Sequence, residues 1–226
     1  MKMHKIVAVG ILLFTSYSLN AQPVVEWQKS LGGTNSDEAN AIHQTSDGGY
    51  IVAGRSYSND GDASGNHGGS DFWVVKLTSG GALDWEKSLG GSGHEVAKSI
   101  QQTSDGGYIV VGNSASNDGD VSGNHGSTDY WICKLSSIGA IEWQKSLGGT
   151  GDETATFVRQ TTSGDYVVAG RTNSTDGNVT LNHGYLDYWI LRLSSTGVIV
   201  WEKSLGGTGF DYGKSIQETS DGGFIV

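Results

Sequence analysis

The heptapeptide WQKSLGG, at residues 27–33, decides the fold because it returns three more times along the chain. Its copies are WEKSLGG at 85–91, WQKSLGG at 143–149 and WEKSLGG at 201–207, so successive copies begin 58 residues apart. A turn that begins at Asp47 with DGGY and an NHG motif that begins at Asn66 recur with the same spacing. A period of this length indicates an array of similar supersecondary units rather than an ordinary single domain.

Each unit predicts four β-strands, which in the first unit are residues 39–45, 50–54, 72–77 and 82–89. The second and third are apolar on both faces, as expected for central strands buried between layers. The fourth alternates, with Leu83, Trp85 and Leu89 on one face, and is therefore expected at the outer edge. Gly-rich turns at residues 46–49 and 78–81 suit tight hairpins. No segment shows the periodicity of a helix.

The sequence therefore predicts an all-β, β-propeller-like array of four-stranded antiparallel blades with a 58-residue repeat. A β-solenoid is the alternative. The expected organisation is a signal peptide at 1–21 and repeats over 22–226, with a leading outer strand and loop at 24–38, units at 39–96, 97–154 and 155–212, and a truncated fourth unit at 213–226. Since the array opens with an outer strand and stops inside a second strand, we expect an incomplete propeller and a fragment.

The first residues predict export. Lys2 and Lys5 precede an apolar run at residues 6–14, and Ala21 ends a plausible cleavage site. The run is short for a bilayer span, which takes about 20 residues, although a membrane anchor or a buried first strand are alternatives. We therefore expect a secreted or bacterial cell-surface protein with no transmembrane segment in the mature chain. The single cysteine, Cys133, excludes a disulfide framework and is expected to be a buried structural thiol.

Composition limits the function. The chain has 36 Gly and one Pro, yet 36% hydrophobic residues are enough to form a core, so disorder is not expected. Lys and Arg number 14 against 24 Asp and Glu, a net charge of −10. This argues against nucleic-acid binding, which needs a basic surface. The expected partner is an extracellular protein or a glycan.

The long loop between the second and third strands has the only chemistry that resembles a binding site. Oxygen-bearing side chains at alternate positions, a Gly at the sixth and an Asp at the twelfth match the needs of a Ca²⁺ loop. The alternative is a turn whose carboxylates cap backbone N–H groups. The candidate ligands are Asp60, Asp62, Ser64, Asn66 and Asp71 in the first unit, and Asp118, Asp120, Ser122, Asn124 and Asp129 in the second. The third unit has Asn178, Thr180 and Leu181 and is expected not to bind.

Other polar and aromatic residues suggest weaker hypotheses. One His per unit, at positions 67, 125 and 183, predicts a hydrogen bond that fixes the loop rather than a metal site. Acidic residues before the first strands suggest a glycosidase acid and base, or simply solvated loop charges; these are Asp37, Glu38, Glu95, Asp152, Glu153 and Asp211. The seven Trp fall on two repeat positions, and we interpret them as core. Trp85, Trp143 and Trp201 are predicted to pack between successive blades.

Two resemblances follow from these motifs. Thr196-Gly197 followed by Trp201 resembles the tryptophan-docking motif of quinoprotein-type propellers, and Ser79-Gly80 with Trp85 resembles it more loosely. The succession SDGGY, DGD, NHG, D-aromatic-Trp and WxKSLGG is similar to Gly-rich propeller-like repeats of secreted bacterial surface proteins, many of them associated with type IX secretion. The resemblance implies an exported, non-enzymatic module with an adhesive or scaffolding role. A glycan-binding module, an accessory part of a polysaccharide-acting enzyme, and a quinoprotein enzyme are the alternatives.

Overall fold

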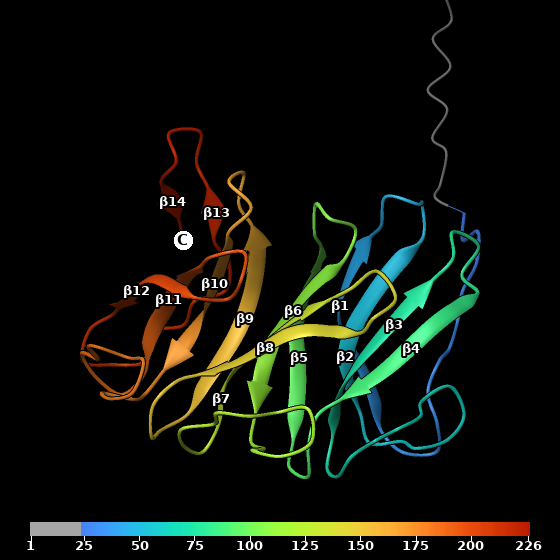
Figure 1. The fold of residues 1–226 in the computed structure, drawn as a ribbon, viewed down its shortest axis with the longest axis horizontal. Helices are drawn as coiled ribbons and strands as arrows, with labels where there is room; N and C mark the ends of the chain where they lie inside the picture. The colour runs from blue at the N-terminus through green and yellow to red at the C-terminus, as the bar shows by residue number, and fades with distance from the viewer. Residues whose placement is uncertain (1–23) are drawn as a thin grey trace, which may run out of the picture.

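A computed structural model describes residues 24–226, so the expected signal peptide lies outside the described residues. The described part contains β-strands, turns and loops but no helix. Accordingly, no helix among these residues is long and apolar enough to cross a membrane. The protein is all-β, and its strands form three four-stranded antiparallel sheets that repeat along the chain (Figure 1).

Each sheet has its four strands in chain order from one edge to the other. The first comprises β1 (Asp37–Gln44), β2 (Tyr50–Ser56), β3 (Asp71–Leu77) and β4 (Leu83–Leu89). The second comprises β5 (Glu95–Gln102), β6 (Tyr108–Ser114), β7 (Asp129–Leu135) and β8 (Ile141–Leu147). The third comprises β9 (Glu153–Gln160), β10 (Tyr166–Thr172), β11 (Asp187–Leu193) and β12 (Ile199–Leu205). The predicted order, with the second and third strands central, is confirmed.

The ends of the array differ from the three sheets. The strands β13 (Gln217–Glu218) and β14 (Phe224–Ile225) form a two-stranded sheet, and Figure 1 places it at the opposite end from β1–β4. The array is not closed into a full propeller. Residues 24–31, expected as an outer strand, form no strand, because no described strand lies beside them to pair with their backbone. Trp27 nevertheless packs edge-on against Tyr50, with ring centroids 5.6 Å apart.

Adjacent sheets pack face to face through aromatic side chains of the third strands. Trp131 of β7 packs against Phe72 of β3, with centroids 4.5 Å apart, and Trp189 of β11 packs against Tyr130 of β7 at 4.7 Å. Trp131 and Trp189 are completely buried. Cys133 is buried in the same core, as expected for a structural thiol. These contacts make the interfaces between sheets, rather than the sheets themselves, the hydrophobic core.

The Trp residues of the outermost strands form a second line of contacts. Trp85 and Trp143 lie edge-on to Tyr108 and Tyr166 of the following sheet, at 5.8 and 5.9 Å between centroids. The prediction that they pack between successive sheets is confirmed in geometry. They are only partly buried, and Trp27 is 37% exposed, so the interpretation of all seven Trp as core was too broad. A Trp at a sheet edge keeps part of its ring in solvent because no further strand covers it.

One glycine in each second strand allows a close approach to the first. The first strand carries a bulge, which shifts the β1–β2 register between Ala39 and Ala41 and the β5–β6 register between Ala97 and Ser99. Opposite the second bulge stands Gly112, where a Cβ would lie 1.9 Å from the carbonyl oxygen of Val96. The glycine that ends Val52-Ala53-Gly54 and Val110-Val111-Gly112 is therefore needed because the bulge brings the first strand too close for a side chain.

Candidate functional site

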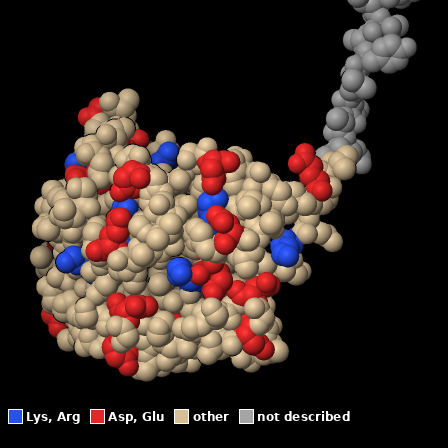
Figure 2. Space-filling model, turned by 45° about the vertical axis from the view of Figure 1, so that its right-hand side comes forward, with Lys and Arg blue, Asp and Glu red and all other residues tan. Residues whose placement is uncertain are grey.

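Antiparallel order places two kinds of loop at the same end of every sheet. We call this end the long-loop end: it carries the loops after the second strands (57–70, 115–128 and 173–186) and the loops that lead into the first strands (32–36, 90–94, 148–152 and 206–210). The tight turns lie at the other end. On the face that Figure 2 shows, acidic and basic side chains are spread without one dominant basic patch. Loops held on a rigid sheet are where binding residues gather.

The carboxylates of the long loops hold the neighbouring backbone. The Asp60 side chain accepts a hydrogen bond from the Thr34 N–H at 2.8 Å, and Asp62 accepts one from the Gly32 N–H at 3.3 Å. The second unit repeats these bonds: Ser92 donates to Asp118 at 2.8 Å and Gly90 donates to Asp120 at 3.2 Å. Charged acceptors on backbone N–H groups make strong hydrogen bonds, so these side chains fix the loop that leads into the next first strand.

The third unit shows what this arrangement requires. Asn178 stands where the other units have Asp62 and Asp120, and its Oδ1 accepts from the Gly148 N–H at 3.1 Å. The preceding carboxylate, Asp176, keeps its bond to the Thr150 N–H at 2.8 Å. A neutral amide therefore takes the same place in the loop as a carboxylate. The position needs a hydrogen-bond acceptor, and this supports the interpretation of the long loop as a backbone-capping turn.

The other candidate ligands point to separate partners. Ser64 donates to Glu86 at 2.6 Å and Ser122 contacts the Gln144 amide at 2.6 Å. Asn66 and Asn124 use their amide N–H groups on backbone carbonyls of their own units, and Asp71 and Asp129 accept from histidine. Within residues 24–226, no group of three or more His, Cys, Asp or Glu side chains is arranged to hold a metal ion. Calcium binding therefore stays a prediction, and it requires these loops to rearrange.

A titration decides between calcium binding and capping. If the first two loops bind Ca²⁺, chelator-treated protein will show heat on Ca²⁺ addition, and its melting temperature will rise by mass action. The affinity expected of an extracellular module is about 10⁻⁴ M. The double variant Asp62→Ala, Asp120→Ala should abolish the heat, while Asp176→Ala in the third unit should leave it unchanged. Absence of both heat and thermal shift at about 5 mM Ca²⁺ would establish the loops as capping turns only.

The histidine of each long loop fixes the loop, as predicted. His67 Nδ1 lies 2.6 Å from Asp71 Oδ2, which also accepts the His67 N–H at 3.1 Å. His125 with Asp129 and His183 with Asp187 repeat the pair at 2.6 Å. The Asp71 side chain is fully buried, and its Oδ1 has no hydrogen-bond partner. The hydrogen bond to Asp71 raises the pKa of His67, and burial raises the pKa of the Asp71 carboxyl.

The acidic residues near the start of the first strands are of two kinds, and only some of them are solvated. Asp37, Glu95, Glu153 and Asp211 occupy one repeat position, a regularity visible in the 58-residue spacing. Each accepts a backbone N–H four residues earlier, at 2.8–2.9 Å. Glu95 and Glu153 are fully buried, so the expectation of solvated loop charges was wrong for them. Their carboxylates are used in fixing loops, and burial raises the pKa of Glu153.

The pKa shifts of these histidine and carboxyl groups predict that the free energy of unfolding is largest at mildly acidic pH. Asp71 and Glu153 bind protons more tightly in the folded protein, so their contribution falls as pH rises above about 4, and the contribution of His67 falls in the same way above about pH 6.5. Asp105 acts oppositely: burial raises its pKa, but hydrogen bonds from Thr103 and Lys134 outweigh this and bring it to about 2. Its contribution is complete above about pH 4 and is lost as pH falls towards 2.

Thermal melts at a series of values between about pH 3 and about pH 8 measure how stability depends on pH. Asp71→Asn should reduce the loss of stability that occurs as pH rises towards neutral. Asp84→Asn, at an exposed position of β4, should leave the dependence of stability on pH unchanged. Stability that rises steadily up to pH 8 would contradict the assigned proton binding.

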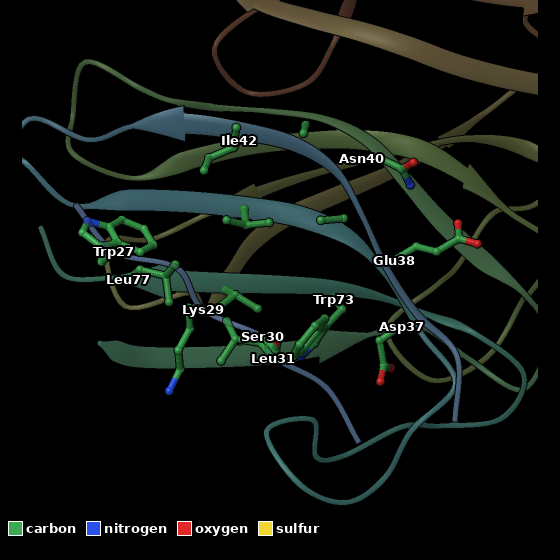
Figure 3. A pocket seen from close by; sticks show the side chains of 14 residues that line it. Trp27, Lys29, Ser30, Leu31, Asp37, Glu38, Asn40, Ile42, Trp73 and Leu77 are labelled. Atoms are coloured by element: carbon green, nitrogen blue, oxygen red, sulfur yellow. The ribbon is translucent and has the colours of Figure 1, made fainter. Parts of the chain in front are cut away.

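A cavity of about 570 Å³ lies between residues 27–31 and the open face of the first sheet (Figure 3). Leu31 packs with Trp73 and Leu77 on that face. In the second and third sheets, the corresponding Trp131 and Trp189 are covered by the preceding sheet. The cavity therefore lies on the face that corresponds to the covered faces of the second and third sheets, and its lining combines apolar side chains with the charged Lys29, Asp37 and Glu38.

A strip of three exposed aromatic rings, which the repeated motifs do not predict, lies at the long-loop end of the third unit. Tyr185, Phe210 and Tyr212 are 70%, 62% and 51% exposed. The Tyr185 and Phe210 rings lie 5.4 Å apart at 13°, and Phe210 and Tyr212 lie 6.5 Å apart at 7°. We call these three residues the aromatic strip. The sequence signal was their departure from the repeat, because Ser127 and Asp152 stand at the Tyr185 and Phe210 positions one unit earlier.

Comparisons with known proteins show no family and one reported structural similarity. No family model matches the chain, and no curated protein matches it. A solved structure described as a protein of unknown function from Bacteroides caccae is similar, with 11% sequence identity and a TM-score of 0.43. The match covers 83% of this chain and 52% of that chain, so this chain spans about half the length of the similar structure.

Proposed function

We propose that the protein is an exported, non-enzymatic repeat module with an adhesive or scaffolding role at the bacterial cell surface. The observation that carries this proposal is the hydrogen-bonded surface at the long-loop end. The Gly69 N–H of one long loop donates to Gly93 at 2.9 Å, and the Gly93 N–H donates to Ser116 of the next long loop at 2.8 Å. Loops fixed to one another across successive sheets form a rigid surface suited to binding.

The polar groups of this surface support a binding role over a catalytic one. The buried carboxylates of Glu95 and Glu153 accept backbone and hydroxyl hydrogen bonds, and Asp71 is paired with His67. A catalytic acid or base needs access to a substrate proton, and full burial denies these groups that access. The expected signal peptide and the acidic surface add support for a role outside the cell.

The location is tested on intact cells that express the tagged chain with and without residues 1–21. The full chain should become accessible to an added protease while a cytoplasmic marker stays intact, and the shortened chain should stay protected. Labelled purified protein should then bind to immobilised cell-surface material. A full chain that remains inside the cells and protected to the same extent as the shortened one would overturn the proposal.

Glycan binding is the second candidate function, and the aromatic strip favours it. Monomeric soluble proteins rarely expose contiguous large apolar groups without a use for them. Aromatic rings offer flat faces on which the C–H groups of a sugar ring pack. An array of neutral and acidic oligosaccharides, probed with the purified chain, separates this candidate from a purely structural module.

A further inference from the structure

We propose that the aromatic strip is the binding site for an acidic polysaccharide, whose sugar rings pack on Tyr185 and Phe210 while its carboxylates pair with Arg171 and Lys214. This inference rests on the glycan-binding candidate and deepens it, because it names the site and the chemical class of the ligand.

Backbone hydrogen bonds between two loops hold the residues of the aromatic strip in place. Leu186 and Phe210 form an isolated parallel bridge. The Leu186 N–H donates to the Gly209 carbonyl at 3.3 Å, and the Asp211 N–H donates to the Leu186 carbonyl at 2.7 Å. These bonds hold Tyr185 and Phe210 side by side on two different loops. A preformed aromatic surface loses little conformational freedom on binding, which favours affinity.

The three rings belong to this place in the array and to no other unit. The corresponding residues are Ser127, Asp152 and Thr154 one unit earlier, and Gly69, His94 and Val96 two units earlier. The motifs beside these positions, NHG, D-aromatic-Trp and WxKSLGG, recur in all three units. Core packing therefore does not explain the strip, since the other units form the same strands and interfaces without it.

Two basic side chains give the strip its preference for acidic sugars. The Arg171 guanidinium lies 5.6 Å from the centre of the Tyr212 ring, and Lys214 Nζ lies 5.8 Å from it. Neither forms an ion pair within residues 24–226, although the chain is strongly acidic overall. A cation beside a stacking surface attracts a ligand that has both an apolar face and a carboxylate.

The net charge of −10 would repel any polyanion that spreads over the surface, whether a nucleic acid or a long acidic polysaccharide, so the ligand proposed for this site is a short run of acidic sugars. A short run of acidic sugars contacts only the local cations.

The test is calorimetric titration of the full chain with a galacturonic acid hexamer, and with cellohexaose as the neutral probe. We expect the acidic hexamer to bind more tightly and its affinity to fall as salt rises. Phe210→Ala should weaken binding roughly tenfold, in the range that loss of one stacking partner produces. The double variant Arg171→Gln, Lys214→Gln should remove the preference for the acidic hexamer. Ile138→Ala, which removes an exposed apolar side chain at the tight-turn end, should change nothing.

Each remaining outcome is decisive. Phe210 and Tyr185 are exposed, so their variants should melt like the unmodified chain, which keeps a loss of binding interpretable. If the unmodified chain binds the acidic hexamer and both Tyr185→Ala and Phe210→Ala bind it equally well, the site is wrong while glycan binding survives. If cellohexaose binds as tightly as the acidic hexamer, the ligand class is wrong. If neither hexamer binds, this inference is overturned, and the surface-module proposal is judged by protease accessibility alone.

Discussion

Trp131→Ala is expected to lower the free energy of unfolding by about 3–5 kcal/mol, the usual loss for a large buried aromatic side chain. Trp131 is completely buried between the first and second sheets, against Phe72. Its indole N–H donates to the Gln144 side chain at 3.0 Å. Removing the ring would leave a cavity in the interface that joins two otherwise separate sheets.

Trp143→Ala is the matched comparison. Trp143 sits at a sheet edge and is only partly buried, so we expect a smaller loss, about 2 kcal/mol. Chemical denaturation of both variants measures the difference. Equal losses, or a larger loss for Trp143→Ala, would show that the outer Trp line and not the third-strand Trp line holds the sheets together. That result would require a different packing of the sheets.

Gly112→Ala is expected to cost at least about 3 kcal/mol, at or above the upper end for overpacked cores. The added methyl group would lie 1.9 Å from the Val96 carbonyl oxygen and 2.9 Å from the Ala97 Cα. Both are backbone atoms of the strand paired with β6, so no side-chain rotation relieves the overlap. The first and second strands would have to separate at the centre of the molecule.

The control for this substitution is Gly80→Ala at the tight-turn end, where a Cβ meets no atom within 4 Å. Its melting curve should match that of the unmodified chain to within the roughly 0.5 kcal/mol of an ordinary surface change. Melting of both variants side by side provides the measurement. If Gly112→Ala melted like Gly80→Ala, the close contact at the bulge would not exist.

The strand order could be predicted because the burial of a strand determines how many of its residues are apolar and on which faces they lie. Residues 72–75 are all apolar because β3 is covered on both sides, and the clean alternation around Trp85 marks an edge. The bulges could not be predicted from strand alternation, since they depend on which carbonyl approaches Gly112 from the paired strand. The leading segment at 24–31 has the sequence of an outer strand, yet a strand also needs a partner for its backbone.

The candidate site was harder to predict because alternate spacing alone does not identify what the side chains meet. Asp60 and Asp62 have the spacing of calcium ligands, and the same spacing directs them to the N–H groups of Thr34 and Gly32. Those groups come from a loop that lies about half a unit earlier in sequence, and only the fold brings it there. The strip residue Phe210 was overlooked because a repeat draws attention to what recurs, whereas this residue departs from it.

The central claim is that successive sheets pack face to face, with aromatic side chains of their third strands in direct contact across each interface. A double-mutant cycle on Phe72→Leu and Trp131→Leu tests it, because these rings lie 4.5 Å apart across the interface. We expect a coupling free energy of about 0.5–1.5 kcal/mol, as for other aromatic pairs in contact. Phe72→Leu combined with Trp189→Leu, whose ring packs in the other interface, should be additive to within about 0.5 kcal/mol. A Phe72–Trp131 cycle as additive as this control would contradict the packing of the array.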